Sequence, residues 1–169
     1  MVIEKNVEIL LASIANQIKQ QYGAKTREQL FMIGIHTGGV WVAEQLHQML
    51  ELTSPLGKLN IAFYRDDFTR IGLHPHVQPS NLPIDINDRK IILVDDVLHT
   101  GRTVRAALNE IFDYGRPASI DLTVLVQRNG RELPIQPTFF GCALHLNKNE
   151  HVKLSGPDPL SLDVYNKKT

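Results

Sequence analysis

The chain has 169 residues, of which 43% are hydrophobic and 21% charged, values that are ordinary for a globular domain large enough to bury a core. Its 18 basic residues balance its 18 acidic residues, so net charge gives no argument for nucleic-acid binding, although a local basic patch stays open. The single cysteine, Cys142, excludes an internal disulfide and a cysteine-based metal cluster. Because no long apolar segment is present and Glu4, Lys5 and Glu8 replace the apolar core of a signal peptide, we expect a cytoplasmic protein without a membrane span.

Hydrophobic periodicity predicts helices and strands in alternation. In chain order, the expected elements are a helix over residues 3–21, a strand over Leu30–Ile35, a helix over Val40–Leu50, a strand over Leu59–Tyr64, a strand over Ile91–Val94, a helix over about 103–114 and a strand over Ser119–Val126. Beyond Arg128, repeated Pro and Gly residues interrupt the pattern. This order predicts one α/β domain over residues 1–169, with a parallel sheet flanked by helices.

A polar stretch, rich in Pro and His, separates two of the expected strands over Arg65–Pro83. Loops of this length in a compact domain are usually lids or disordered segments. We expect a mobile cover over a site, because closing a lid excludes water from a reactive intermediate. A solvated loop without a function is the alternative.

The most informative segment runs from Ile91 to Thr103. Four consecutive apolar residues, Ile91–Val94, predict a strand that is covered on both faces. Asp95 and Asp96 follow at its carboxyl end, where open α/β sheets bind ligands. The next loop, His99–Thr103, is small and hydroxylated and leads into a helix, whose free N–H groups attract a phosphate. This order suits a ligand with sugar hydroxyls and a phosphate, whereas a structural acid pair or a generic Mg²⁺ site is the alternative.

A second turn from strand to helix reads Gly34-Ile35-His36-Thr37-Gly38-Gly39. Glycines let main-chain N–H groups approach an anion, because no Cβ stands in the way. Taken alone, the turn is equally well explained as a tight connection. Together with the loop after the acidic pair, it predicts a binding site for pyrophosphate. The chain lacks the Gly-x-x-x-x-Gly-Lys-[Ser/Thr] motif, so a P-loop nucleotidase is disfavoured.

The block Ile91–Thr103 resembles the phosphoribosyl-diphosphate (PRPP) signature of type I phosphoribosyltransferases. Tyr64–Asp67, Gly115–Pro117 and Arg131–Ile135 further resemble the PyrR family, pyrimidine operon attenuation regulators that also act as uracil phosphoribosyltransferases. The resemblance covers about residues 30–141. It implies the type I phosphoribosyltransferase fold, a parallel α/β core with a small hood, here mostly from about 128–169. The implied reaction converts uracil and PRPP to UMP and pyrophosphate with Mg²⁺, a step of pyrimidine salvage.

Site roles follow from the resemblance, position by position. It implies that Asp95 and Asp96 hold the ribose diol and the Mg²⁺, directly or through water, and that Arg65 neutralises the leaving group. The 5′-phosphate loop would be His99, Thr100, Gly101, Arg102 and Thr103. The pyrophosphate loop would be His36, Thr37, Gly38 and Gly39, with a non-proline cis peptide. Phe139 or Phe140 would stack on the base, although both are equally well explained as core aromatics.

The sequence also departs from the family. The pyrophosphate loop usually reads Thr-Arg-Gly, so Thr37-Gly38-Gly39 lacks a cation, and Gln127–Gly130 replaces the usual Asp-Arg-Gly-His. The tail Cys142–Asn147 does not match the family either. Because parts of these segments are associated with messenger RNA in the family, regulation of a pyr mRNA leader is a weaker expectation than the PRPP site. Two alternatives stay open, an RNA-binding regulator with PRPP-site nucleotides as effectors, and a transferase for a purine base such as hypoxanthine. Similar proteins form dimers or tetramers, so a homo-oligomer is expected.

Overall fold

The computed structural model describes residues 6–61 and 80–167. The elements in chain order are α1 (Val7–Gln21), α2 (Ala24–Arg27), β1 (Leu30–Ile35), α3 (Gly38–Met49), β2 (Gly57–Leu59), β3 (Lys90–Leu98), α5 (Arg102–Tyr114), β4 (Ser119–Arg128), β5 (Phe139–Leu144), β6 (Glu150–Ser155) and β7 (Ser161–Asn166). No helix among the described residues is both long and apolar enough to cross a membrane.

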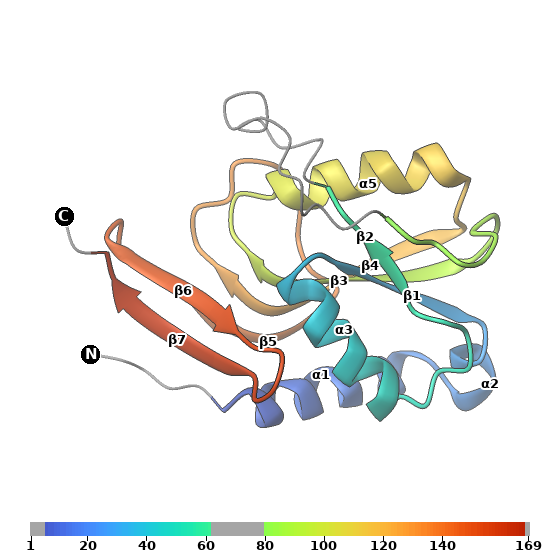
Figure 1. Cartoon of the computed structure of the whole chain (residues 1–169), viewed down its shortest axis with the longest axis horizontal. Coiled ribbons are helices and arrows are strands. Elements are labelled where there is room, and N and C mark those ends of the chain that lie inside the picture. Colours follow the sequence, from blue (N-terminus) through green and yellow to red (C-terminus); the bar gives the residue numbers. More distant parts are fainter. Residues whose placement is uncertain (1–5, 62–79, 168–169) are drawn as a thin grey trace.

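Five strands form the central sheet in the order β2-β1-β3-β4-β5, and each neighbouring pair is parallel. All five carboxyl ends therefore lie at one edge of the sheet. In Figure 1, β3 and β4 end on the left. The predicted α/β fold with a parallel sheet is confirmed, and α3 and α5 follow directly from this edge.

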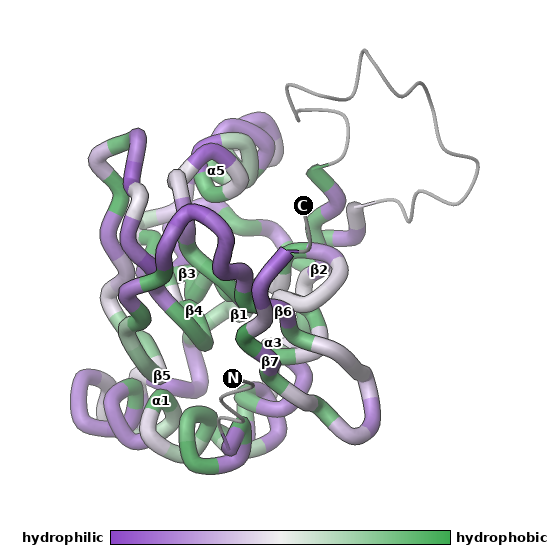
Figure 2. The backbone as a smooth tube through the Cα atoms, turned by 90° about the vertical axis from the view of Figure 1, so that its left-hand side faces the viewer, coloured by the Kyte–Doolittle hydropathy of each residue, from purple (hydrophilic) through white to green (hydrophobic). Residues whose placement is uncertain are grey.

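Helices cover both faces of the sheet, with α5 on one side and α1 and α3 on the other (Figures 1 and 2). All six residues of β1 are buried, as are Ile91–Asp95 of β3. Each face has its own apolar core, because side chains along a strand point alternately to opposite faces. Ile14, Ile18 and Leu46 lie in the core beneath α1 and α3, while Ile111 lies in the core beneath α5.

The first helix shows how local sequence defines an element. The side-chain oxygen of Asn6 accepts a hydrogen bond from the amide of Ile9 at 3.3 Å and caps the helix. The buried residues of α1 recur at helical spacing and are Val7, Leu10, Leu11, Ile14, Ala15 and Ile18. The predicted helix is confirmed from residue 7 onward, and residues 1–5 lie outside the described part of the chain.

Two strands differ from their predicted bounds. The second strand is Gly57–Leu59 and ends where a strand over Leu59–Tyr64 was expected to begin. The third strand continues through the acidic pair to Leu98, because β4 is long enough to pair with it as far as Gln127. The acids consequently lie within the last part of a strand and not in the loop after it.

The chain beyond Arg128 is more regular than its pattern indicates. Phe139–Leu144 forms β5, which pairs with β4 and completes the main sheet. Only β6 and β7 stand apart, as an antiparallel two-stranded sheet that packs on the core through Leu154 and Leu162. The part expected to form most of the hood, about 128–169, thus contains both one strand of the central sheet and this two-stranded sheet, and its role as a hood stays a prediction.

Candidate active site

Two turns from strand to helix lie next to each other at the carboxyl edge of the sheet. The turn of residues 36–37 joins β1 to α3, and the turn of residues 99–101 joins β3 to α5. Their strands are hydrogen-bonded neighbours, with Gly34 opposite Val94. The structure thus brings together the two segments that the sequence predicts to bind pyrophosphate and the 5′-phosphate.

The acidic pair lies between these turns. Asp95 is 6% exposed, and its Oδ1 accepts a hydrogen bond from the amide of Asp96 at 2.9 Å. Asp96 is half-buried, and its Oδ1 accepts from the amide of Val97 at the same distance. These bonds orient both carboxylates and keep Oδ2 of Asp96 directed toward the first turn, as its position near Gly38 shows.

Gly38 and Gly39 pack directly against the acids. A Cβ built on Gly38 would overlap Oδ2 of Asp96, and one built on Gly39 would lie 2.6 Å from the carbonyl oxygen of Val94. Only glycine permits this approach. No side chain caps α3, and no described residue accepts from the amides of Gly38 and Gly39, so both are available to an anion.

His36 leads into this turn. Its amide donates to the carbonyl of Leu59 at 2.8 Å, and the peptide bond between His36 and Thr37 is cis, as the family resemblance implies. Burial lowers the pKa of His36, the nearby cation of Lys58 lowers it further, and Glu44 opposes the shift. The lowered pKa favours the neutral imidazole, so this turn offers amide donors in place of a fixed positive charge.

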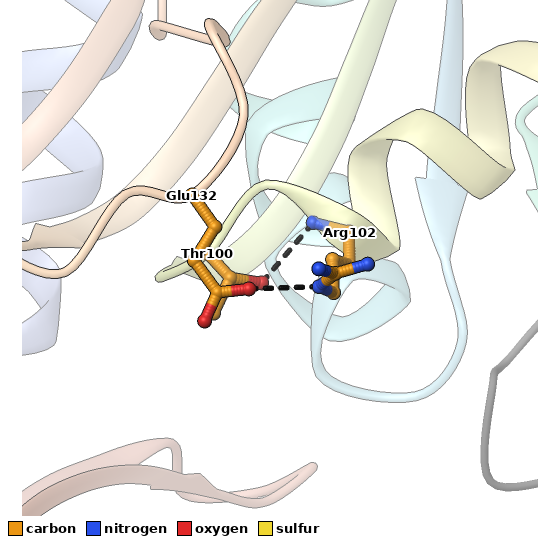
Figure 3. Close-up of polar contacts among 3 residues, drawn as sticks. All are labelled: Thr100, Arg102 and Glu132. Atoms are coloured by element: carbon orange, nitrogen blue, oxygen red, sulfur yellow. Dashed lines mark hydrogen bonds and ion pairs between the residues drawn. The ribbon is translucent and has the colours of Figure 1, made fainter.

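The second turn is shaped by Gly101, the residue before α5. Its φ of +93° is in the left-handed region, which favours glycine. The hydroxyl of Thr100 accepts from the amide of Arg102 at 3.2 Å, and Nε of Arg102 forms an ion pair with Glu132 at 2.8 Å (Figure 3). Among the described residues, none accepts from the amides of Thr100, Gly101 and Thr103. These N–H groups are available to an anion at the start of a helix of 13 residues.

His99 explains one departure from the family pattern. Its Nε2 lies 2.8 Å from the place that a Cβ of Gly130 would occupy, and Gly130 has a φ of +105°. A side chain at position 130 would meet both steric and backbone obstacles. The pKa of His99 is lowered, first by burial and then by the cations of Arg128 and Arg131. Glycine at position 130 therefore leaves room for the imidazole of His99.

The two phenylalanines expected near the base have different surroundings. Phe139 is 5% exposed and lies in the core beneath α1, so it has no free face for stacking. Phe140 is half-buried and lines a cavity of about 420 Å³ together with Gln127 and Arg131. Both residues begin β5, two strands away from the acidic pair. Base stacking stays a prediction for Phe140, and the core explanation applies to Phe139.

Arg65 lies outside the described residues, as do most of the residues of the expected cover, 65–79. The three residues that sequence reasoning did not assign to the site are Arg131, Glu132 and Leu133. The amides of Glu132 and Leu133 donate to the carbonyl of Thr100 at 3.0 and 3.1 Å. Their motif was visible only as a family resemblance, because no periodicity or spacing connects residues 131–133 with residue 100.

The acidic pair fits Mg²⁺ by its chemistry, since hard cations prefer carboxylate oxygens and keep several waters. Gly38 leaves the space around Oδ2 of Asp96 free of a side chain, which suits an ion and a bound phosphate together. In the described part of the chain, no group of three or more His, Cys, Asp or Glu residues could hold an ion by itself. A metal here would therefore share its ligands with substrate and water.

The phosphoribosyl transferase domain family matches residues 2–155. A protein of Nitrosococcus oceani named "Bifunctional protein PyrR" is 60% identical over 164 residues, which cover 96% of this chain and 93% of that protein. One of the same name from Pseudomonas paraeruginosa is 53% identical over 154 residues, 91% of each chain. A solved hypoxanthine-guanine phosphoribosyltransferase of Bacillus anthracis has the same fold, with a TM-score of 0.68 and 14% identity over 98% of this chain and 99% of that one. The chain therefore belongs to the PyrR family of phosphoribosyltransferases.

Proposed function

We propose that this protein transfers the phosphoribosyl group of PRPP to uracil, with UMP and pyrophosphate as products. The observation that carries the proposal is the contact of the glycine turn with the acidic pair. Gly38 packs against the side chain of Asp96, and Gly39 packs against the backbone of Val94. The amides of one proposed anion site therefore lie next to the two carboxylates. The second anion site follows the same strand, because β3 ends at Leu98 and α5 begins at Arg102.

The proposed reaction makes few demands on nucleophilic or basic side chains. The bond between C1′ and the pyrophosphate oxygen breaks as N1 of uracil bonds to C1′, and the N1 proton leaves to solvent. The enzyme has to hold both ends of PRPP and to stabilise the charges that develop, so positioning and electrostatics account for the catalysis. The amides of residues 38–39 would hold the leaving pyrophosphate, and those of residues 100–103 would hold the 5′-phosphate.

Asp95 and Asp96 would orient the ribose hydroxyls and hold Mg²⁺, directly or through water. When bound, Mg²⁺ supplies positive charge to the pyrophosphate oxygens. The positive charge of Mg²⁺ matters more in this protein, because the turn has glycine where family members carry arginine and because the lowered pKa of His36 favours its neutral form. Arg65 keeps its expected role of neutralising the leaving group as a prediction.

We propose uracil as the base because relatives at 50–60% identity bear the PyrR name, whereas two purine phosphoribosyltransferases of the same fold share only 18% and 14% identity with this chain. The test incubates the protein with PRPP, Mg²⁺ and uracil, with hypoxanthine in a parallel tube, and separates the products by chromatography. UMP in the uracil tube alone supports the proposal. IMP in the hypoxanthine tube alone would replace uracil with a purine base, and no nucleotide from protein that binds PRPP would contradict an enzymatic role.

A second function is favoured by the word "Bifunctional" in the names of the relatives. We propose regulation of a pyr mRNA leader in the cytoplasm as this function, with PRPP-site nucleotides as effectors. Backbone binding of RNA depends on clustered Lys and Arg residues and weakens as salt rises. A gel shift of pyr leader RNA that weakens with salt and responds to UMP would support regulation. A shift that is indifferent to UMP would contradict the effector role.

The expected homo-oligomer stays a prediction.

A further inference from the structure

Three consecutive carbonyl groups, that of Leu98 at the end of β3 and those of His99 and Thr100 in the 5′-phosphate loop, accept hydrogen bonds from one short segment, Arg131–Leu133. Nη1 of Arg131 donates to the carbonyl of Leu98 at 3.4 Å and also to that of His99. The carbonyl of Thr100 accepts from the amides of Glu132 and Leu133. The segment therefore contacts the side of the loop on which these carbonyls lie.

The next carbonyl, that of Gly101, accepts from the amide of Arg105 within α5 at 3.0 Å. Every carbonyl from residue 98 to residue 101 thus has a donor. Because the C=O and N–H of one trans peptide group point in opposite directions, holding the carbonyls of His99 and Thr100 leaves the amides of Thr100 and Gly101 directed away from the segment. Neither of these two amides has an acceptor among the described residues, and the same holds for the amide of Thr103 in the first turn of α5.

Side-chain packing supports the same arrangement. A Cβ built on Gly101 would lie 3.4 Å from Leu133 and from Ile135, which is ordinary van der Waals contact. Leu133 and Ile135 therefore form an apolar support beneath the loop. The ion pair of Arg102 with Glu132 adds less, because both side chains are more than half exposed and solvent weakens their attraction (Figure 3).

Arg131 differs from Arg102 in its partners. Its hydrogen bonds go to carbonyl oxygens, which include that of Arg128 at 3.5 Å, and no carboxylate in the described part of the chain forms an ion pair with it. Its positive charge is therefore not neutralised locally. It lies behind a loop whose front presents amides, so it adds to the positive potential that an anion meets there.

We propose that Arg131–Leu133 is a clamp that holds the 5′-phosphate loop in its anion-binding shape before substrate arrives, with Arg131 as the positioning residue. The proposal rests on the proposed function for the identity of the anion, a sugar 5-phosphate. Arg131 acts through the carbonyls of residues 98 and 99 and does not contact the phosphate itself. The clamp predicts a selective effect, because among the described residues no hydrogen bond or ion pair joins this segment to the other anion site, at residues 38–39.

The experiment measures binding of two probes by calorimetry, ribose 5-phosphate for the clamped loop and pyrophosphate for the other. In Arg131→Ala, binding of ribose 5-phosphate is expected to weaken about tenfold to a hundredfold, the range for losing hydrogen bonds to a charged group. Pyrophosphate binding is expected to change less than about twofold, because its site keeps its geometry. Arg131→Lys, which keeps the charge and a single nitrogen with N–H donors, should recover part of the loss. Arg116→Ala is the matched control, because Arg116 is exposed and uses only its backbone in described hydrogen bonds.

A second readout needs no ligand. Hydrogen exchange at the amides of Glu132 and Leu133, which donate to the carbonyl of Thr100, is expected to accelerate in Arg131→Ala and to stay unchanged in Arg116→Ala, while amides of β1 keep their protection. Unchanged exchange at these two amides, or equal losses of both probes, would overturn the clamp. Faster exchange in a protein whose parent binds no ribose 5-phosphate would instead support the clamp and contradict the proposed function. If Arg131→Ala does not fold, Arg131→Lys carries the same comparison with a smaller expected effect.

Discussion

The carboxylate of Asp96 occupies the space that a side chain at Gly38 would fill. The two residues come from different strand-to-helix connections, and their contact joins the turn after β1 to the acidic end of β3. With Asp96 in this position, a Cβ at position 38 would overlap its Oδ2, so a larger residue there requires the carboxylate to move.

Gly38→Ala tests this contact. The added Cβ has to displace Asp96 or the turn, and because small misplacements at a reacting centre are costly, kcat/KM with PRPP is expected to fall about 100-fold. Gly23→Ala is the control, because nothing lies within 4 Å of a Cβ built there. Equal activity of the two variants in a steady-state assay would show that the contact is not part of the active arrangement.

Asp96→Asn tests the acidic pair. The substitution keeps the shape and the acceptor for the amide of Val97 but removes the charge, so kcat is expected to fall about 100-fold with little change in stability. Asp88→Asn provides the comparison, because Asp88 is exposed and its φ of 58° is one that asparagine tolerates. The assignment of Asp96 fails if its variant turns over as fast as the Asp88 variant under saturating PRPP.

Substitutions at Gly101 test whether its backbone conformation, and not a lack of space, requires glycine. A Cβ meets its neighbours at an ordinary 3.4 Å, so only the φ of +93° disfavours a side chain. Gly101→Ala is expected to lower the free energy of unfolding by about 1–2 kcal/mol or to weaken binding of ribose 5-phosphate by changing the loop. Gly101→Asn should have a smaller effect, since asparagine visits the left-handed region more readily. Urea unfolding and calorimetry on both variants distinguish the cases, and an equal cost for Ala and Asn would contradict the backbone explanation.

Glu110 predicts a pH dependence of stability. It is 7% exposed on α5, accepts a hydrogen bond from the hydroxyl of Ser80 at 2.5 Å, and its Oε2 has no partner among the described residues. Burial raises the pKa of Glu110, the charge of Asp113 raises it further, and the bond from Ser80 opposes the shift. Because the pKa of Glu110 is higher in the folded state, the protonated side chain contributes to the free energy of unfolding. This contribution is complete below the unfolded-state pKa of 4.5 and is lost as pH rises through the folded-state pKa.

Glu110→Gln is neutral at every pH and keeps the acceptor for Ser80. Its free energy of unfolding relative to the parent protein is therefore expected to improve between pH 5 and pH 8, as measured by urea unfolding at both values. Glu28→Gln, at an exposed position, serves as the reference for a surface carboxylate. A constant difference between Glu110→Gln and the parent across this range would show that Glu110 titrates as an ordinary exposed acid.

Sequence patterns predicted the fold class and most of the elements up to Arg128, because strands that are covered on both faces are apolar throughout. They missed β5, whose short segment Phe139–Leu144 follows two prolines and contains Gly141. The reason is tertiary. A Cβ at Gly141 would lie 2.6 Å from the carbonyl oxygen of Leu125 and 3.0 Å from Leu10 of α1, so glycine serves close packing there and does not end the strand.

The chain alone determined the residues of the two turns that we propose to bind anions and of the acidic pair, because each is a contiguous segment whose chemistry depends on neighbours along the chain. Tertiary structure decided what those segments contact. The order of strands placed Gly38 against Asp96, and the path from β4 to β5 placed Arg131 behind Leu98 and His99. Such contacts depend on sheet order and on the register of parallel strands, which local propensity does not encode.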